Sequence, residues 1–292
     1  MSSNVVLGSA TRQNLLSLQD INHNIGTSQN ALATGLKVSS AVDNAVVFFQ
    51  SQSLTNRASD LQNRNNTINQ GISSLTTATQ AAASVDNILT QLQGILNSAA
   101  TETAAQRAAA GTQFNTISKQ LNNLVNAASY QGLNLVNSST STLSLQFSLS
   151  STDTFKIKGG NLQVSVLVTV HAVASKLASV IVLNSVGAAQ KFSLVSNKTS
   201  RFQAAFNILQ NAIFSAQATA QTLGGNVTLL QTRLSFNQQY VTTLSGGSDK
   251  LVVADVNKES TNLVTLQTRQ QLAIQSLSIA TQSEQAVLRL FH

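Results

Sequence analysis

The chain has 292 residues, no cysteine, no proline, and charged residues amount to only 9% of it. Ordinary soluble domains carry about 25% charged residues, so this surface is expected to associate with other chains. The absence of cysteine excludes disulfide bonds and thiolate metal sites. The net charge is +7, but lysine and arginine are scattered singly, so we expect no nucleic-acid partner.

The first segment, residues 1–11, lacks the charged region, apolar core and cleavage site of a Sec-type signal peptide. If the protein is exported, another machine must recognise it. An amphipathic helix is predicted next, because apolar positions then follow one another at steps of three and four: Leu18, Ile21, Ile25, Ser28 and Leu32. Gly35 is expected to end this helix in a turn that includes Thr34 and Lys37.

A long second helix and a shorter third one are predicted from the same spacing. The second seam runs from Leu54 to Ala82, and then continues in a shifted register from Val85 to Ala99. The third seam contains Phe114, Ile117, Leu121, Leu124 and Ala128. Such helices bury their seams against one another in an elongated bundle.

The apolar period changes from helical to strand-like in the middle of the chain. Strand-like sequence begins at Tyr130–Val136, and then apolar and polar residues alternate through Leu143, Leu145, Phe147, Leu149, Phe155 and Ile157. Val164–Val170 alternates too, and residues 160–197 are predicted to form a small β-rich insertion. Val164–Leu183 is the stretch nearest to a membrane span, but it contains His171 and Lys176, so we expect no membrane insertion.

The clearest seam lies late in the chain and predicts a helix over residues 200–245. Its positions are Phe202, Phe206, Leu209, Ile213, Ala216, Ala220, Leu223, Val227, Leu230, Leu234, Asn237, Val241 and Leu244. Only Asn237 is polar, and it either fixes the helix register or is a tolerated residue at the seam edge. Gly224 and Gly225 are expected to weaken or kink this helix, and Gly246–Gly247 to end it at a hinge.

The last helix carries a fifth seam, which we expect to pair with the first: Leu263, Leu266, Gln270, Ala273, Leu277, Ala280, Glu284, Val287 and Phe291. An isolated amphipathic helix is marginal in water without a packing partner. The predicted fold class is therefore mainly α, an elongated antiparallel helical bundle or coiled coil with a small β-rich insertion. The predicted assembly residues are Leu18, Ile21, Ile25, Leu32, Leu263, Leu266, Leu277, Val287, Leu288 and Phe291.

No enzyme chemistry is indicated by the sequence. His23, His171 and His292 are far apart, and HExxH, P-loop and GxGxxG motifs are missing. We therefore predict no catalytic residue, cofactor or metal. The acidic residues Asp43, Asp255 and Glu259 are interpreted as residues that cap or start helices, where negative charge is favourable.

Several of these segments, in this order, resemble bacterial flagellins, and most closely those of alphaproteobacteria. The resemblance is carried by Asn30–Ala45, Gln70–Leu75, Tyr130–Leu135, Ala254–Ser260, Leu266–Leu272 and Val287–Phe291. It covers roughly residues 1–137 and 200–291. This chain departs from the family at Asn44, where a second acidic residue is common, and at His292, which extends the usual Leu-Phe ending.

The resemblance implies a domain plan. Residues 1–42 and 253–292 would form an inner coiled-coil domain, residues 43–159 and 198–252 a rod domain, and residues 160–197 a short variable outer domain. It also implies a structural subunit that polymerises into the extracellular flagellar filament for motility, after export in an unfolded state through the flagellar type III apparatus. The expected partners are copies of itself, a secretion chaperone, and the filament cap and hook-junction proteins.

Two alternatives remain open at this stage. A hook–filament junction protein would share the terminal segments. A flagellin-like cell-surface protein that binds polysaccharide would need a basic or aromatic groove within residues 155–200, for which the weak indication is a set of lysines: Lys156, Lys158, Lys176, Lys191 and Lys198.

Overall fold

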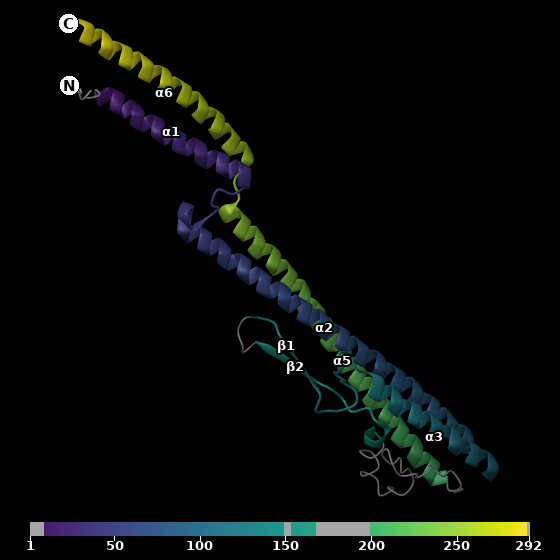
Figure 1. Ribbon diagram of the computed structural model, residues 1–292. Helices are drawn as coiled ribbons and strands as arrows, with labels where there is room; N and C mark the ends of the chain where they lie inside the picture. The colour runs from purple at the N-terminus through teal and green to yellow at the C-terminus, as the bar shows by residue number, and fades with distance from the viewer. Residues whose placement is uncertain (1–8, 149–152, 168–198, 291–292) are drawn as a thin grey trace. The chain divides into compact units, whose positions relative to one another are not determined.

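The computed structural model describes residues 9–148, 153–167 and 199–290 (Figure 1). Five long helices and one β-hairpin are found there. In chain order they are α1 (Ser9–Thr34), α2 (Ala41–Ala99), α3 (Ala104–Ala127), β1 (Thr142–Gln146), β2 (Thr154–Lys158), α5 (Thr199–Val252) and α6 (Val256–Leu290). The predicted mainly helical fold with a small β element is confirmed.

The chain divides into two compact units. One consists of residues 60–240, and the other of residues 1–59 together with residues 241–292. Both α2 and α5 contribute to each unit. The domain boundaries implied by the family resemblance fall elsewhere, at the ends of the terminal segments, and they stay a prediction.

The core of the unit 60–240 is made by α2, α3 and α5. The predicted seams are confirmed, because their residues are buried: Leu61, Ile68, Leu75, Ala82, Val85, Leu92 and Ala99 on α2, Phe114, Ile117 and Leu121 on α3, and Leu209, Ile213, Ala216, Leu223 and Leu230 on α5. Thr103 precedes α3, and its N–H and hydroxyl both donate to Gln106 Oε1. These two bonds tie the side chain of Gln106 back to the residue before α3 and so fix where the helix begins.

The β-hairpin packs on this helical core by its apolar face. The strands are antiparallel, with Leu143 opposite Ile157 and Leu145 opposite Phe155. A Cβ atom added to Gly71 of α2 would lie only 2.7 Å from Leu145 Cδ1, so the glycine permits the close approach of the hairpin. The alternation predicted for these strands is confirmed as far as Phe147, while Leu149 lies outside the described residues.

The segment before the hairpin is a set of turns rather than the expected strand. Gln131 and Gly132 have positive φ angles of 50° and 82°, and Tyr130 and Leu133 exchange backbone hydrogen bonds around them. The side chain of buried Asn134 then takes the place of hydrogen bonds to a neighbouring strand. Its Nδ2 donates to the carbonyl of Val125, and its Oδ1 accepts from the amides of Val136 and Asn137. A single side chain thus satisfies the end of α3 and the turn that follows.

The prediction of a strand from Val164 onward is wrong for residues 164–167. Residues 164–167 form one helical turn, in which the amides of Val166 and Leu167 both donate to the carbonyl of Gln163. The reason is that Val164 and Leu167, three residues apart, are both buried by this turn. The remainder of the predicted β-rich insertion, residues 168–197, lies outside the described residues.

In the unit formed by residues 1–59 and 241–292, α5 continues through Gly246–Gly247 as far as Val252. The hinge predicted at these glycines is therefore wrong. Immediately after them, the hydroxyl of buried Ser248 lies 2.8 Å from that of Ser51 on α2, which holds this part of α5 against α2. Likewise, α5 is helical through Gly224 and Gly225.

The helix breaks occur instead where two connections pair with each other. Leu36, between α1 and α2, forms an antiparallel bridge with Val253, between α5 and α6. The amide of Lys37 donates to the carbonyl of Val252, and the amide of Ala254 donates to that of Gly35. Gly35 has φ of +71° and ends α1 as predicted. None of the described helices is long and apolar enough to span a membrane.

Candidate assembly interface

The terminal helices α1 and α6 lie side by side and run antiparallel (Figure 1). Two side-chain hydrogen bonds join them: Ser28 Oγ donates to Glu259 Oε2 at 3.0 Å, and Gln270 Nε2 donates to Asn22 Oδ1. Ser28 was predicted as a seam residue and is buried. The pairing of the two chain ends is thus fixed by both apolar and polar contacts.

Seven of the predicted assembly residues are only partly buried in the α1–α6 pair. Leu18, Ile21, Ile25 and Leu32 of α1 and Leu263, Leu266 and Leu277 of α6 are all partly exposed. Val287 and Leu288 belong to the last turns of α6, and Phe291 lies outside the described residues. Two helices alone cannot enclose a seam, so much apolar surface still faces water after they pair.

α6 carries a second apolar stripe, which the predicted seam does not include. Val256, Val264, Leu272 and Ile279 are spaced by seven or eight residues and are 54%, 62%, 61% and 60% exposed. From Val264 to Leu272 and from Leu272 to Ile279 the spacing corresponds to about two helical turns, so these three side chains share one face, whereas Val256 lies on another. The signal was present in the sequence, but polar residues at the intervening turns concealed it. A helix that is apolar on two faces is typical of one buried on several sides.

The connections beside this pair are held by carboxylates at helix starts, as predicted for Asp255. Asp255 Oδ1 accepts from the amides of Asn257 and Lys258, so it caps α6. Asp43 has a different role: its Oδ2 accepts the amide and hydroxyl protons of the two preceding serines, Ser39 and Ser40. These bonds, first those from Ser39, hold the pKa of Asp43 below its ordinary value of 3.8.

Asn44, the residue after Asp43, interrupts α2 and caps its main part. Its φ and ψ are −162° and 99°, and its Oδ1 accepts from the amide of Val47 at 3.1 Å. Glu259, the third carboxylate singled out in the sequence, lies one turn into α6 and accepts from Ser28. Its negative charge is in the first turn of α6, where it is favourable as predicted, and its hydrogen bond with Ser28 also joins the two terminal helices.

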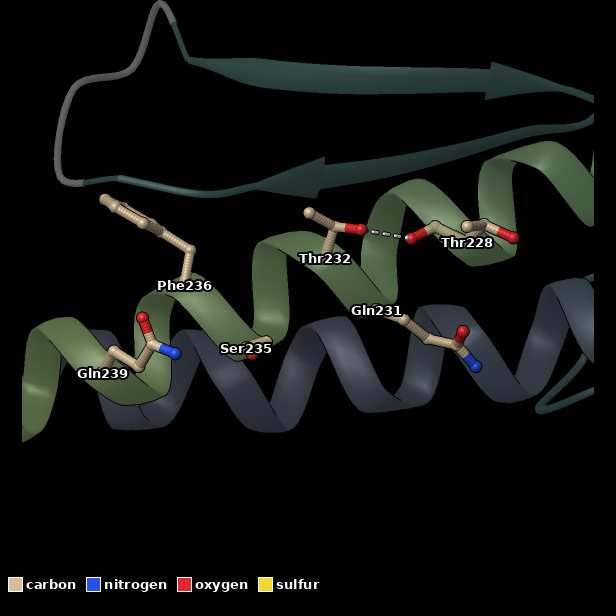
Figure 2. A pocket seen from close by; sticks show the side chains of 6 residues that line it. All are labelled: Thr228, Gln231, Thr232, Ser235, Phe236 and Gln239. Carbon is tan, nitrogen blue, oxygen red and sulfur yellow. Dashed lines mark hydrogen bonds between the residues drawn. The ribbon is translucent and has the colours of Figure 1, made fainter.

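A hollow of about 500 Å³ lies in the other unit, on α5 near the hairpin (Figure 2). Its lining residues are all exposed: Thr228, Gln231, Thr232, Ser235, Phe236 and Gln239. Phe236 points from α5 toward the hairpin, as Figure 2 shows, and stacks on Tyr240 with ring centroids 6.0 Å apart. The lining contains no titratable group, so it offers no acid, base or metal ligand for catalysis.

Of the lysines of the polysaccharide-binding alternative, the two that the structure describes do not line this hollow. Lys156 and Lys158 are exposed on β2, and Lys176, Lys191 and Lys198 lie outside the described residues. Within the described part of the chain, no group of three His, Cys, Asp or Glu residues is arranged to hold a metal ion. His23 is exposed on α1, whereas His171 and His292 are not described.

Comparison with known proteins agrees with this helical arrangement. The family model described as the bacterial flagellin N-terminal helical region matches residues 5–141. A flagellin of Brucella melitensis is 28% identical over 99% of both chains, and flagellin C of Rhizobium meliloti is 27% identical over 99% of both. Over nearly its whole length, this chain is similar to bacterial flagellins. The predicted resemblance to alphaproteobacterial members is confirmed by these relatives.

A solved structure supports the flagellin fold independently of close sequence similarity. The structure of a putative flagellar hook-associated protein from Vibrio parahaemolyticus matches 71% of this chain and all of its own length, with a TM-score of 0.53 and 12% identity. At this identity the likeness concerns the fold alone.

Proposed function

We propose that this chain is a flagellin, a structural subunit that polymerises into a flagellar filament, and that α1 and α6 supply the assembly contacts. The observation that carries the proposal is the incomplete burial of these helices. Their shared seam is only half buried, and the outer stripe Val264, Leu272 and Ile279 is uncovered. Further copies of the chain would cover both surfaces and gain the hydrophobic free energy that the pair leaves unused.

Folding and assembly would then be coupled. In the isolated subunit, residues 1–42 and 253–292 would be largely disordered, since a two-helix pair with a half-exposed seam is marginal. In the filament they would fold against neighbouring copies through contacts that do not close into a ring, which produces an open helical polymer. Hydrogen exchange on dilute subunits tests this step: strong protection of both termini would contradict it.

The other partners follow from family membership. A secretion chaperone would hold the uncovered apolar faces of α6 before export. The type III apparatus would then export the chain unfolded to the extracellular filament, where cap and hook-junction proteins would be its neighbours. Among the alternatives, no specific observation favours a junction protein, because the hook-associated likeness concerns the fold alone. For the polysaccharide-binding role, the described residues give no support, because neither Lys156 nor Lys158 lines the hollow on α5.

The assembly role is tested by Leu277→Asp, with Leu277→Met as the matched control. Leu277 lies in the α1–α6 seam, and a carboxylate there must remain hydrated, which opposes packing. Methionine keeps the apolar character and nearly the volume. We expect Leu277→Asp to abolish filament growth from purified, seeded subunits, measured by sedimentation and electron microscopy, while Leu277→Met polymerises normally. Ile25→Asp should behave as Leu277→Asp does.

The fold of the unit 60–240 serves as the internal control. Its hydrogen-exchange protection should be the same in all three variants, because it contains neither substituted position. Normal filaments from Leu277→Asp would refute the proposal.

A further inference from the structure

Two asparagines lie in the apolar seam between α2 and α5. Asn65 of α2 is 7% exposed and Asn237 of α5 is 3% exposed. Among the described residues, neither Asn65 Oδ1 nor Asn237 Nδ2 has a hydrogen-bond partner, although both atoms are buried. Buried amide atoms are nearly always hydrogen-bonded, because an unpaired one keeps the full cost of its desolvation. Each of these two atoms therefore requires a partner.

The register of the two helices brings the asparagines to the same level. Within the unit 60–240, Gln93 Nε2 donates to Gln210 Oε1 at 2.8 Å, and Gln217 Nε2 donates to Asp86 Oδ1 at 3.2 Å. One further contact extends the series, since a Cβ atom on Gly224 would lie 4.0 Å from Thr79 Cγ2. Successive contacts are seven residues apart on both helices, in opposite directions. The pairing is thus antiparallel with one constant register.

If the same register continues along both helices, it places the two asparagines close to each other. Asn65 lies fourteen residues before Thr79 on α2, and Asn237 lies thirteen residues after Gly224 on α5. Their levels differ by one residue, or about 1.5 Å of helix rise. The two unpaired atoms are also complementary, because an amide oxygen accepts a hydrogen bond and an amide nitrogen donates one.

We propose that Asn237 Nδ2 donates to Asn65 Oδ1, directly or through one buried water molecule, and that this amide pair sets the register of α2 against α5. The terminal torsion of an asparagine is broad, so a modest rotation can aim the two groups at each other. The inference concerns the subunit itself and does not depend on polymerisation.

A register device is needed because the rest of the seam is repetitive. Ile68, Leu75, Leu223 and Leu230 are buried apolar residues, and sliding one helix by seven residues again places apolar side chains against one another. Such a slide separates Asn65 from Asn237 and leaves both amides unpaired against apolar neighbours. A single buried asparagine layer selects one register in coiled coils for the same reason.

A double-mutant cycle on the full chain tests the pairing. Asn65→Leu and Asn237→Leu alone should each lower the Tm by several degrees, because each leaves its partner unpaired. The double variant should melt at or above the wild-type temperature, because both amides are then gone. The control cycle uses Gln93→Leu and Gln210→Leu, a hydrogen-bonded but partly exposed pair that water can satisfy. If the decrease in Tm of the double variant equals the sum of the decreases of the two single variants, the pairing is refuted.

Cross-linking tests the register, and the absence of natural cysteine makes it unambiguous. The pair Asp86→Cys with Gln217→Cys reports the native register, and Asp86→Cys with Gln210→Cys reports a slide of seven residues. With both asparagines present, only the native pair should form a disulfide on oxidation. In the Asn65→Leu/Asn237→Leu background, the shifted pair should cross-link as well. A shifted pair that stays reduced in that background would refute the register role.

Discussion

Single polar side chains determine where the long helices of this chain begin. At the start of a helix, Asn44 and Asp255 each accept hydrogen bonds from backbone amides two or three residues further along the chain. Asp43 instead accepts hydrogen bonds from the serines before it. Caps of this kind satisfy amides that have no partner within the helix. They matter here because α2 and α6 begin beside the paired connections of the chain ends.

Replacing Asn44 tests its capping role. Asn44→Ala removes the oxygen that accepts from the Val47 amide, and we expect a loss of about 1 kcal/mol in unfolding free energy. Asn44→Asp, the matched control, keeps an acceptor and restores the acidic residue common at this position in the family, so it should be neutral or stabilising. Chemical denaturation measures the stability, and amide exchange at Val47 locates the change. Equal stability of the alanine variant and wild type would count against the cap.

The turn at Ser39 and Ser40 should respond to acid through Asp43. The folded-state pKa of Asp43 lies below its ordinary value, so the carboxylate contributes stability above the unfolded-state pKa. That contribution is lost as the pH falls through the folded-state pKa. In the assembled filament, where these residues are folded, we expect the amides of Ser39 and Ser40 to lose hydrogen-exchange protection only on that acid side. In Asp43→Asn their protection should be low and independent of pH, and a retained acid transition would assign the effect to another group.

At the scale of whole elements, the seams could be predicted from sequence, but the helix ends could not. A three-four spacing of apolar residues directly reflects which side chains are buried, so Ile68, Phe114 and Leu209 were identified correctly. The end of α5 depends instead on the pairing of Val253 with Leu36, more than 200 residues away. No local pattern reports such pairing, and Gly246–Gly247 was therefore mistaken for the hinge.

The candidate interface, too, could be predicted from the sequence only in part. The half-buried seam with Leu263 and Leu277 follows from helical periodicity. The outer stripe with Val264 and Leu272 does not stand out, because its apolar residues recur only every second turn. The hydrogen bond between Ser28 and Glu259 was also beyond prediction, because it depends on the long-range pairing of the two terminal helices.

Substitution by alanine should change the stability of the unit 60–240 in opposite directions at two of its glycines. A Cβ atom on Gly94, within α2, would meet nothing within 4 Å, so Gly94→Ala should stabilise the helix by up to about 1 kcal/mol. A Cβ atom on Gly159, after β2, would lie 2.6 Å from the carbonyl oxygen of Leu135. Because backbone cannot yield as a side chain can, Gly159→Ala should cost about 1–3 kcal/mol. Denaturation midpoints compare the two, and a stabilised Gly159→Ala would contradict the close approach.

At the scale of the whole molecule, the net charge of +7 opposes assembly while the apolar terminal helices favour it. Identical copies carry the same charge and repel one another, whereas the interface on α1 and α6 is mainly apolar and only weakly dependent on salt. Salt should therefore act chiefly by screening the repulsion. Raising NaCl from about 0.01 M to about 0.15 M shortens the Debye length from about 30 Å to about 8 Å.

We accordingly expect the critical concentration for polymerisation to fall over this range of NaCl, and to fall further in sulfate, which strengthens apolar association. Sedimentation of seeded filaments at each salt concentration measures it. Raising the pH toward the pI of about 10.1 should act in the same direction, because it reduces the net positive charge. If ion pairs between copies held the polymer instead, NaCl would weaken them and the critical concentration would rise, so the direction of the salt effect distinguishes an apolar interface from an ionic one.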